Sequence, residues 1–479
     1  MHHGRCFLRL PQPLHDGRLR RAGIDSSGQV VYFRQSFASI EISTGTPIKK
    51  AHNNKKMPMN NTLAHHLFRP SLLRALRVLA SALLLACSPL ALAQQDLNWV
   101  TTWSAAPSSL PPGLLPPEAI TDAYDNQTLR LIVHSSAGGD VVRVRLSNTH
   151  GNKRLQIGSA TIALQSEGSA VVPESLTRLT FGGEESVTIA RGGLVFSDPV
   201  AFTVPQLSNL AVSLYIPAPS GTVTTHLAAA QTSYVSAPGD FTGSVPFNTA
   251  EEIPVWNYLT AIDVGRNDNI TTIVTLGDSI TDGVGSNANL NNRWPNYLAR
   301  RMLLDPQVPD FAIANAGISG NRVLQENSPR FGENLQLRFE RDVLALSNVS
   351  HIVLLEGIND IGMPALMVPG EEVTPEEIIA GYRQIITRAH ARGIKIIGAT
   401  LTPFEGAAYY TPEGEVKRQA VNAWIRTSGE FDGIIDFEIP ARDPSHITRL
   451  VPSYTTDNLH PNDEGYKAMA EAVDLDLFR

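Results

Sequence analysis

The sequence predicts a two-domain protein in which an all-β domain precedes a three-layer α/β domain built on a parallel sheet. The chain has 479 residues, more than a single hydrophobic core usually organises. Between about residues 99 and 262, short runs rich in Val, Ile, Thr and Phe are separated by Gly, Pro, Asn and Ser. After Asn267, apolar runs of strand length alternate with helical segments, which is typical of a parallel sheet covered on both faces.

The all-β domain is predicted from the period and spacing of its strands. In the run 141–146, Val-Val-Arg-Val-Arg-Leu, apolar residues alternate with arginines, which is the period of a strand with one face in water. Turn residues interrupt such runs at regular intervals, which favours a β-sandwich or jelly roll. The strands expected in this domain are 129–134, 141–148, 186–190, 201–204 and 210–216.

The α/β domain is predicted from strands and helices that follow one another in strict alternation. Pro375 stands at the start of one helix, where proline is favoured. The expected strands are 271–276, 311–315, 351–355, 394–401 and 433–437. The expected helices are 294–304, 335–346, 375–392, 415–427 and 462–473.

The segment before the β domain has the composition of a secretory signal. Arginines between residues 69 and 77 precede the apolar run 78–86, and a small-x-small cleavage site ends at Ala93. The apolar run is far shorter than the ~20 residues that a membrane-spanning helix requires. We therefore expect cleavage near Ala93, a secreted or periplasmic protein, and no transmembrane segment in the mature chain.

Two further expectations concern this leader. Residues 1–56 show no sustained helical or alternating period, and a start at Met57 or Met59 would give the signal an ordinary length. Leu-Leu-Ala-Cys ending at Cys87 also resembles a lipoprotein box, so an anchor at Cys87 is the alternative to soluble export. The expected organisation is an upstream extension and signal over 1–93, a β-sandwich accessory domain over 94–268 and an α/β domain over 269–479.

Cysteine use and charge exclude several kinds of site. Cys6 and Cys87 both precede the predicted cleavage site, so the mature chain would have no disulfide, thiol nucleophile or cysteine metal site. Removing residues 1–93 leaves 26 Lys and Arg against 43 Asp and Glu, a formal charge of −17. Such a field repels nucleic acid and anionic membrane surfaces and favours neutral substrates.

The strongest chemical signal is Gly-Asp-Ser-Ile-Thr at 277–281, directly after the apolar run 273–276. Ligands of an open α/β sheet bind beyond the carboxyl ends of its strands, so Ser279 stands where a nucleophile would act. Taken alone, Gly-Asp-Ser after a strand is equally ordinary turn chemistry.

A serine hydroxyl needs a base that is itself oriented by a third group. Asp457 and His460 lie three residues apart in a loop just before the last predicted helix, so both side chains can turn toward one point. The alternatives are a surface decoration or a metal pair, but the loop holds no further ligand to complete a metal site. His460 is thus the candidate base and Asp457 its orienting group.

Acyl transfer also needs donors aimed at the developing oxyanion. Gly317 follows the second strand, where a glycine lets a backbone N–H approach a ligand closely, and Asn359 follows the third with a side-chain amide. Four blocks now occur in order: GDSIT, NAGISGN, EGIND and DNLHP.

These blocks resemble those of the SGNH (GDSL-type) hydrolase superfamily over roughly residues 271–475. The resemblance implies a flavodoxin-like three-layer fold, Ser279 as nucleophile, and His460 with Asp457 completing a triad. It further implies an oxyanion hole made by the Ser279 and Gly317 amides and the Asn359 side chain. No metal or organic cofactor is implied. The surrounding sequence, including Arg-Trp-Pro at 293–295, is similar to the arylesterase-like subgroup of acylhydrolases.

The prediction is therefore a secreted serine esterase that acts through an acyl-enzyme on a small-molecule or polysaccharide ester, with short acyl groups on carbohydrate or aryl alcohols preferred. Alternatives are a lipase or phospholipase, an acyltransferase of the same fold, and a carbohydrate-binding protein with an inactive hydrolase domain. Nucleic acid is not expected as a partner. His226 in the β domain is a further candidate to reach the site, although a lone histidine is more often structural.

Overall fold

The computed structural model describes residues 21–24, 30–33, 97–109, 123–326 and 331–479, so the predictions about Cys87 and Ala93 lie outside the described residues. The chain divides into two units, Met1–Ala86 and Cys87–Arg479. In the first, β1 (Arg21–Ile24) pairs antiparallel with β2 (Val30–Phe33). None of the helices in the described ranges has the length and apolar character that crossing a membrane demands.

The second unit begins with a β-rich region, which confirms that part of the predicted fold. A five-stranded antiparallel sheet has the order β11-β6-β18-β3, with β12 also paired to β6, and a six-stranded sheet has the order β16-β15-β5-β13-β8-β9. The first sheet contains β3 (Asn98–Ser104), β6 (Gly139–Ser147), β11 (Leu194–Phe196), β12 (Val200–Val204) and β18 (Leu259–Arg266). The second contains β5 (Gln127–His134), β8 (Ser159–Leu164), β9 (Thr177–Leu179), β13 (Asn209–Ile216), β15 (Ser233–Ser236) and β16 (Thr249–Ile253). Smaller sheets contain β4 (Ser108–Ser109), β14 (Thr224–His226) and β17 (Trp256–Asn257), and β7 (Leu155–Ile157) with β10 (Val187–Ile189).

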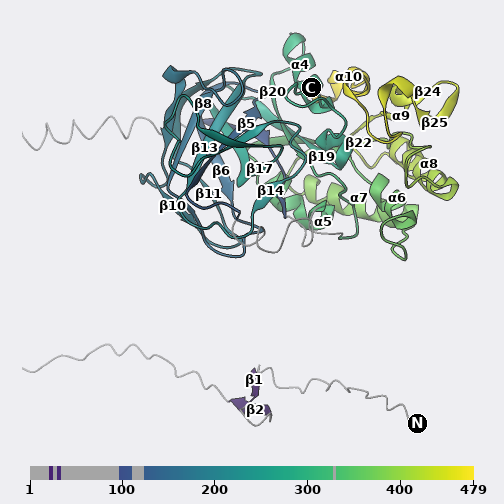
Figure 1. Ribbon diagram of the computed structural model, residues 1–479. Helices are drawn as coiled ribbons and strands as arrows, with labels where there is room; N and C mark the ends of the chain where they lie inside the picture. The colour runs from purple at the N-terminus through teal and green to yellow at the C-terminus, as the bar shows by residue number, and fades with distance from the viewer. Residues whose placement is uncertain (1–20, 25–29, 34–96, 110–122, 327–330) are drawn as a thin grey trace, which may run out of the picture. The chain divides into compact units, whose positions relative to one another are not determined.

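Side chains from both large sheets share one apolar cluster, for example Val144 of β6 and Val212 of β13, which are fully buried. The sequence predicted that the arginines of β6 lie on a face in water, and the structure corrects this, because both are engaged in contacts within the protein. Arg145 is buried and donates to Thr260 Oγ1 at 3.0 Å, and Arg143 pairs with Asp263 Oδ2 at 3.0 Å. Figure 1 draws this region in blue and teal.

The remainder of the unit is an α/β domain whose parallel sheet has the order β20-β19-β21-β22-β23. In chain order this is 2-1-3-4-5, the order of flavodoxin-like doubly wound sheets. Its strands are β19 (Thr271–Gly277), β20 (Phe311–Gly317), β21 (Val349–Leu355), β22 (Lys395–Ala399) and β23 (Gly433–Ile435). The predicted strands are therefore present, with bounds that differ by a few residues.

Helices lie on both sides of this sheet, with α4 and α10 on one side and α5 and α7 on the other (Figure 1). The helices are α3 (Ser279–Asp282), α4 (Trp294–Leu304), α5 (Leu335–Phe339), α6 (Ile358–Gly362), α7 (Pro375–His390), α8 (Pro412–Thr427), α9 (Glu438–Ala441) and α10 (Asp463–Glu471). The expected helix 335–346 is α5 followed by a π-helical turn, Glu340–Leu344. A short pair, β24 (Arg442–Asp443) with β25 (His446–Leu450), follows α9.

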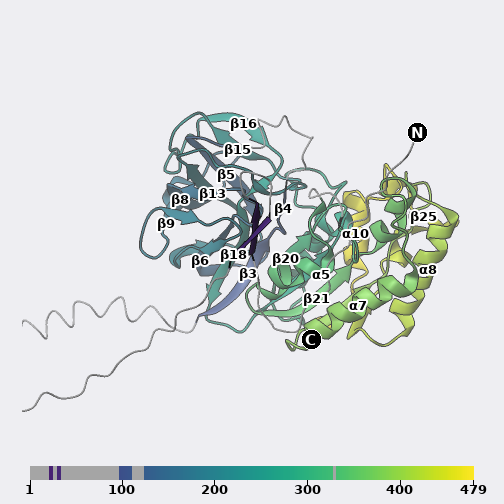
Figure 2. The same cartoon turned by 90° about the horizontal axis from the view of Figure 1, so that it is seen from below.

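The β-rich region meets the α/β domain where β3 runs beside the edge strand β20, as Figure 2 shows. Ser104 Oγ donates to Asn315 O at 2.8 Å. Ser136 Oγ donates to Ile313 O at 2.9 Å and accepts from Ile313 N at 2.8 Å. These contacts use the backbone groups of β20 that no neighbouring strand of the parallel sheet pairs with, and they bring the β-rich region to the carboxyl ends of the strands.

Candidate active site

Ser279 stands at the turn between β19 and α3, where the strand ends at Gly277 and the helix begins at Ser279 itself. The carboxylate of Asp278 caps this helix, because Asp278 Oδ1 accepts from Ile280 N at 3.0 Å. Within the described residues, the Ser279 amide donates no hydrogen bond to another group. The turn therefore presents both the hydroxyl and the amide of Ser279 beyond the carboxyl end of the central strand.

The structure brings Ser279, His460 and Asp457 into one hydrogen-bonded chain. His460 Nε2 lies 2.9 Å from Ser279 Oγ, and His460 Nδ1 lies 2.7 Å from Asp457 Oδ2. Since an ionised carboxylate only accepts, Nδ1 carries the proton and Nε2 is left to accept from the serine hydroxyl. This is the arrangement that a base needs to activate a hydroxyl nucleophile.

The loop before α10 fixes the Asp457 carboxylate through its own backbone. Asp457 Oδ1 accepts from the amides of Leu459 at 3.0 Å and His460 at 2.9 Å. Partial burial opposes the charged form, but the hydrogen bonds from His460 and Leu459 and the electrostatic attraction of the His460 ring outweigh it and hold the pKa of Asp457 well below its usual range. The carboxylate therefore stays ionised beside the imidazole, although half of its side chain is exposed.

Asn359 lies in the first turn of α6 with its side chain almost fully buried. Its Nδ2 donates to Asn321 O at 2.9 Å, and its Oδ1 accepts from the Tyr409 hydroxyl at 3.1 Å. These two contacts fix which way the amide faces, and they leave one N–H of the Asn359 amide for another acceptor. Asn359 and Tyr409 both line the cavity above Ser279.

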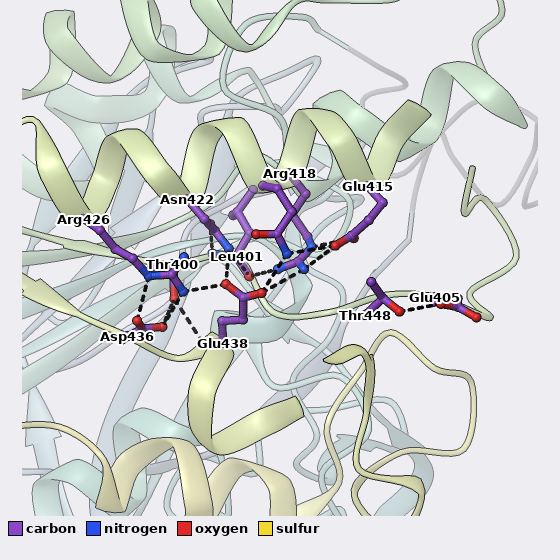
Figure 3. A network of polar contacts seen from close by, with 11 residues as sticks. Thr400, Leu401, Glu405, Glu415, Arg418, Asn422, Arg426, Asp436, Glu438 and Thr448 are labelled. Carbon is purple, nitrogen blue, oxygen red and sulfur yellow. Dashed lines mark hydrogen bonds and ion pairs between the residues drawn. The ribbon is translucent and has the colours of Figure 1, made fainter. Parts of the chain in front are cut away.

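Tyr409 belongs to the segment that follows β22, and a polar network holds the start of this segment against α8 (Figure 3). Arg418 Nη1 donates to Leu401 O at 2.7 Å, and Asn422 Oδ1 accepts from Leu401 N at 2.8 Å. Glu438 joins Arg418 to Arg426 from below, with a 3.0 Å contact to Arg418 Nη2. The network thus anchors the chain that carries the Tyr409 hydroxyl.

The two glycines of Asn-Ala-Gly-Ile-Ser-Gly-Asn differ in what their surroundings allow. The Gly317 amide donates to Asn315 Oδ1 at 2.8 Å, and a Cβ on Gly317 would lie 2.4 Å from Asp282 N. Gly317 therefore permits close packing of β20 on α3, and its N–H is engaged instead of facing a ligand as predicted. Gly320 has φ +78°, lines the cavity, and donates its amide to no other described residue.

A cavity of about 450 Å³ opens over Ser279 and His460. Its wall is largely apolar and comes from several parts of the chain, chiefly the segment after β14, the segment after β20 and the residues around 363–367. The apolar residues in it are Leu227, Ala228, Val284, Ile318, Phe331, Met363, Leu366, Met367, Ala408 and Leu459. Leu366 and Met367 are each 54% exposed, so the apolar wall continues to the rim.

Carboxyl groups beneath the site are deeply buried. Burial raises the pKa of Asp278 to about 7, of Glu356 to about 8 and of Asp360 to about 6. Arg338 lies among them and donates to Gly277 O at 2.9 Å and to Asn321 Oδ1 at 2.7 Å. Asp360 in turn accepts from the Val323 amide at 2.8 Å, so these groups tie the ends of the strands together.

His226 also reaches this cavity from the β-rich region. Its Nε2 lies 2.9 Å from Asp282 Oδ1, at the end of the helix that begins with Ser279. Asp282 Oδ2 accepts from the Ser319 amide at 2.9 Å and from its hydroxyl at 2.6 Å. The β-rich region therefore contributes a side chain to the wall of the site.

A family model matches residues 275–468, and its description is GDSL-like lipase/acylhydrolase family. This part of the chain belongs to that family. The predicted superfamily and enzyme class are thereby confirmed: the α/β domain is an acylhydrolase domain, and the chain is a carboxylic ester hydrolase. Among the described residues of this acylhydrolase, no three His, Cys, Asp or Glu side chains are grouped to hold a metal ion.

Solved structures similar to the acylhydrolase domain include a GDSL-like lipase from Bacteroides thetaiotaomicron, at 23% identity over 42% of this chain and 85% of that chain, with a TM-score of 0.31. An acetyl xylan esterase, AlAXEase, matches at 20% identity over 42% and 96%, with a TM-score of 0.32. A catalytic mutant of an acetylxylan esterase from Geobacillus stearothermophilus matches at 20% identity over 42% and 91%, also at 0.32. None of the curated proteins matches the chain.

Some residues of the acylhydrolase site had no sequence signal strong enough to single them out. Gly320 stands three residues after Gly317 in the same block, and the two differ only in features that the sequence does not print: the left-handed backbone of Gly320 and the bond from the Gly317 amide to Asn315. Tyr409 and Ser319 reach the site through tertiary contacts. Asp282 carried a usable signal, because it lies one helical turn after Ser279.

Proposed function

We propose that this acylhydrolase is a serine esterase that works through a covalent acyl-enzyme, with Ser279 as nucleophile, His460 as base and Asp457 as its orienting carboxylate. The observation that carries the proposal is the hydrogen-bonded chain from Asp457 through His460 to Ser279 Oγ, at 2.7 and 2.9 Å, opening on an apolar cavity. Each contact has the length and polarity that proton transfer from the hydroxyl requires.

In the first half-reaction, Ser279 Oγ bonds to the ester carbonyl carbon while its proton passes to His460 Nε2. The carbonyl electron pair moves to the oxygen, which becomes an oxyanion. The carbon–oxygen bond to the alcohol then breaks, and His460 returns the proton to the departing alkoxide. In the second half-reaction, water loses its proton to His460, attacks the acyl carbon and releases the acid and the serine hydroxyl.

We assign the oxyanion donors to the Ser279 amide, the Gly320 amide and the remaining Asn359 Nδ2 proton. Gly320 replaces the predicted Gly317, because the Gly317 amide already donates to Asn315 Oδ1. A Cβ at position 320 would meet the Phe331 ring at 2.2 Å, and φ +78° disfavours any other residue there. Three converging donors stabilise the charge that develops on the carbonyl oxygen.

For the substrate we infer a neutral ester with a short acyl group on a carbohydrate or aryl alcohol, since the chain from residue 94 carries a formal charge of −17. A lipase-like preference for longer acyl chains is the second candidate, and the apolar wall that continues to Leu366 and Met367 favours it. Hydrolysis rates on p-nitrophenyl esters of two to twelve acyl carbons, measured beside acetylated xylan, separate the two.

Ser279→Ala tests the nucleophile, with Ser286→Ala as the matched control in the segment after α3. Ser286 Oγ donates to Gly283 O at 2.7 Å and does not line the cavity. We expect Ser279→Ala to lose on the order of 10⁴-fold or more in kcat with an unchanged unfolding temperature, and Ser286→Ala to keep native rates. Substantial ester hydrolysis by folded Ser279→Ala would contradict the proposal.

We further propose that the acylhydrolase is exported, with cleavage near Ala93, and that residues 94–268 form a β-sandwich accessory domain to a hydrolase domain over 269–479. The one apolar cluster shared by the two large β-sheets supports the sandwich assignment. N-terminal sequencing of the exported protein tests the cleavage site. A Cys87→Ser variant that is still exported and processed would exclude the lipoprotein alternative.

A further inference from the structure

The ring of His226 lies between two hydrogen-bond acceptors. Nδ1 is 2.9 Å from Ala106 O, and Nε2 is 2.9 Å from Asp282 Oδ1. A carbonyl oxygen accepts and cannot donate, and a carboxylate beside an imidazole likewise accepts. Both ring nitrogens satisfy their partners only when both carry protons, so the geometry is that of an imidazolium.

The surroundings hold this ring in place and bury most of its surface. The side chain of His226 is 6% exposed and that of Asp282 is 4% exposed. The ring lies against Trp256, with centroids 5.4 Å apart and planes 30° apart, and Trp256 Nε1 donates to Ile132 O at 2.7 Å. A buried ion pair of this kind is retained at a desolvation cost, which points to a role beyond stability.

Among the described residues, two charged groups face His226. They are Asp282, at the end of α3, and Arg293, the residue just before α4. Burial and Arg293 disfavour the charged ring, but the carboxylate and the Ala106 carbonyl outweigh them and raise the pKa of His226. The Arg293 guanidinium is directed to backbone oxygens, since Nε donates to Asp282 O and Nη2 to Ala229 O. It therefore leaves the Asp282 carboxylate to His226 and Ser319.

Asp282 links the ring to the oxyanion side of the site. Its second oxygen accepts both the amide and the hydroxyl of Ser319, the residue immediately before Gly320. A shift of the Asp282 carboxylate would therefore move Ser319 and turn the Gly320 amide away from the ester oxygen. Because misplacement by about 1 Å can cost on the order of 10²-fold in rate, this support has kinetic consequences.

We propose that His226 of the β-rich region is a positioning residue of the esterase, an imidazolium that holds Asp282 and, through it, the Ser319–Gly320 backbone. The inference rests on the proposed function, because it gives the Gly320 amide its orientation for catalysis. The β-rich region thereby completes the active site in addition to packing against it.

His226→Gln tests the proposal, because Gln has one donor nitrogen where the imidazolium has two on different sides of the ring, and because it carries no charge. We expect kcat on p-nitrophenyl acetate to fall by about 10- to 100-fold with KM changed by less than about threefold, since the oxyanion contact forms in the transition state. The matched control is His390→Gln, which removes another His–carboxylate pair, 2.8 Å from Asp432 and remote from the cavity. It should keep native kcat.

The charge state of His226 can be measured separately, by NMR of the full chain. At pH 7.5 the ¹⁵N spectrum of the native protein, assigned by comparison with His226→Gln, should show both ring N–H signals of His226. A single N–H, or native kcat in folded His226→Gln, would overturn the proposal. If His226→Gln fails to fold, Ser319→Ala decides: kcat reduced about 3- to 10-fold supports the linkage, and unchanged kcat overturns it.

Failure of this inference is distinguishable from failure of the proposed function. If native protein hydrolyses esters and a fluorophosphonate labels Ser279, the esterase assignment stands whatever the His226 variants do. If neither occurs in the native protein, the esterase assignment itself fails.

Discussion

The two sides of the active site are built in opposite ways. The base side is a single loop before α10, in which the Asp457 side chain is half exposed and is held by local backbone amides. The oxyanion side is buried and is supported from a distance by Tyr409, Asp360 and the His226–Asp282 pair. A base must exchange protons with substrate and water, whereas oxyanion donors must stay fixed while charge develops.

The two His–Asp pairs differ in the partner of the ring nitrogen that does not face the aspartate. In His460 that nitrogen faces a hydroxyl, which can donate, so the ring can be neutral and take up a proton. In His226 it faces a carbonyl, which only accepts, so the ring has no free lone pair and cannot act as a base. The same pair of residue types therefore supplies a proton acceptor on one side and a fixed cationic support on the other.

The largest expected effect lies on the base side. His460→Gln removes the proton acceptor, so kcat on p-nitrophenyl esters should fall on the order of 10⁴- to 10⁶-fold. The unfolding temperature should change by less than a few degrees, because the loop is exposed and locally held. Asp457→Asn, which keeps the base but removes its orienting carboxylate, should lower kcat by a smaller factor. A His460→Gln protein that retains a tenth of native kcat would contradict the assignment of His460 as the base.

On the oxyanion side, activity and stability should fall together. Asn359→Ala removes one oxyanion donor and should cost on the order of 10²- to 10³-fold in kcat. It also leaves the buried Asn321 carbonyl and Tyr409 hydroxyl without their partner, which should destabilise the fold by about 1–3 kcal/mol. Kinetics and thermal unfolding measured on one preparation check both. A loss of activity with no loss of stability would contradict the claim that buried hydrogen bonds to Asn321 and Tyr409 hold the oxyanion donor in place.

A smaller effect is expected from Tyr409→Phe. The change removes only the hydroxyl that donates to Asn359 Oδ1, so the amide loses one of its two fixed contacts. We expect about a tenfold loss in kcat with little change in KM. Tyr410→Phe, the adjacent and half-buried tyrosine, is the matched control and should leave kcat unchanged. Equal losses in both variants would contradict the assigned role.

The smallest effect is a pH dependence of stability. The raised pKa of His226 means that its pairing with Asp282 stabilises the fold fully below the ordinary histidine pKa of about 6.5 and less as pH rises through the folded value. Asp282→Asn should therefore lower the unfolding temperature more at about pH 6 than at about pH 9, by a few degrees. The contribution of Asp457 to stability depends on pH in the opposite direction. Because its pKa is lowered in the folded protein, that contribution is lost only as pH falls. A pH-independent effect of Asp282→Asn would contradict an imidazolium at His226.

The base side was predictable from sequence because its elements are local. Ser279 follows an apolar strand directly, and Asp457 and His460 lie three residues apart in one loop. The sheet was predictable for the same reason, since each parallel strand contains a short local run rich in apolar residues. The strand β18 was not, because Asp263 interrupts its apolar pattern and becomes tolerable only when Thr101 Oγ1 donates to it at 2.8 Å and Arg143 pairs with it.

The oxyanion side was predictable only in part because tertiary structure decides it. Gly317 ends β20 and Gly320 follows it, and nothing in the residues themselves says that Asn315 engages one amide while the other has φ +78°. The reach of His226 across 56 residues of sequence to Asp282 depends on how the β-rich region packs beside β20. In physical terms, long-range contacts fixed what local patterns left open.

The most direct test of the central claim is to trap the covalent enzyme. Native protein treated with a fluorophosphonate, digested and analysed by mass spectrometry should carry one added phosphonyl group on the peptide that contains Ser279. His460→Gln should label far more slowly, because its serine has no base. Labelling at another residue, or an unmodified Ser279 in protein that is fully folded, would contradict the account and favour a binding protein with an inactive hydrolase domain.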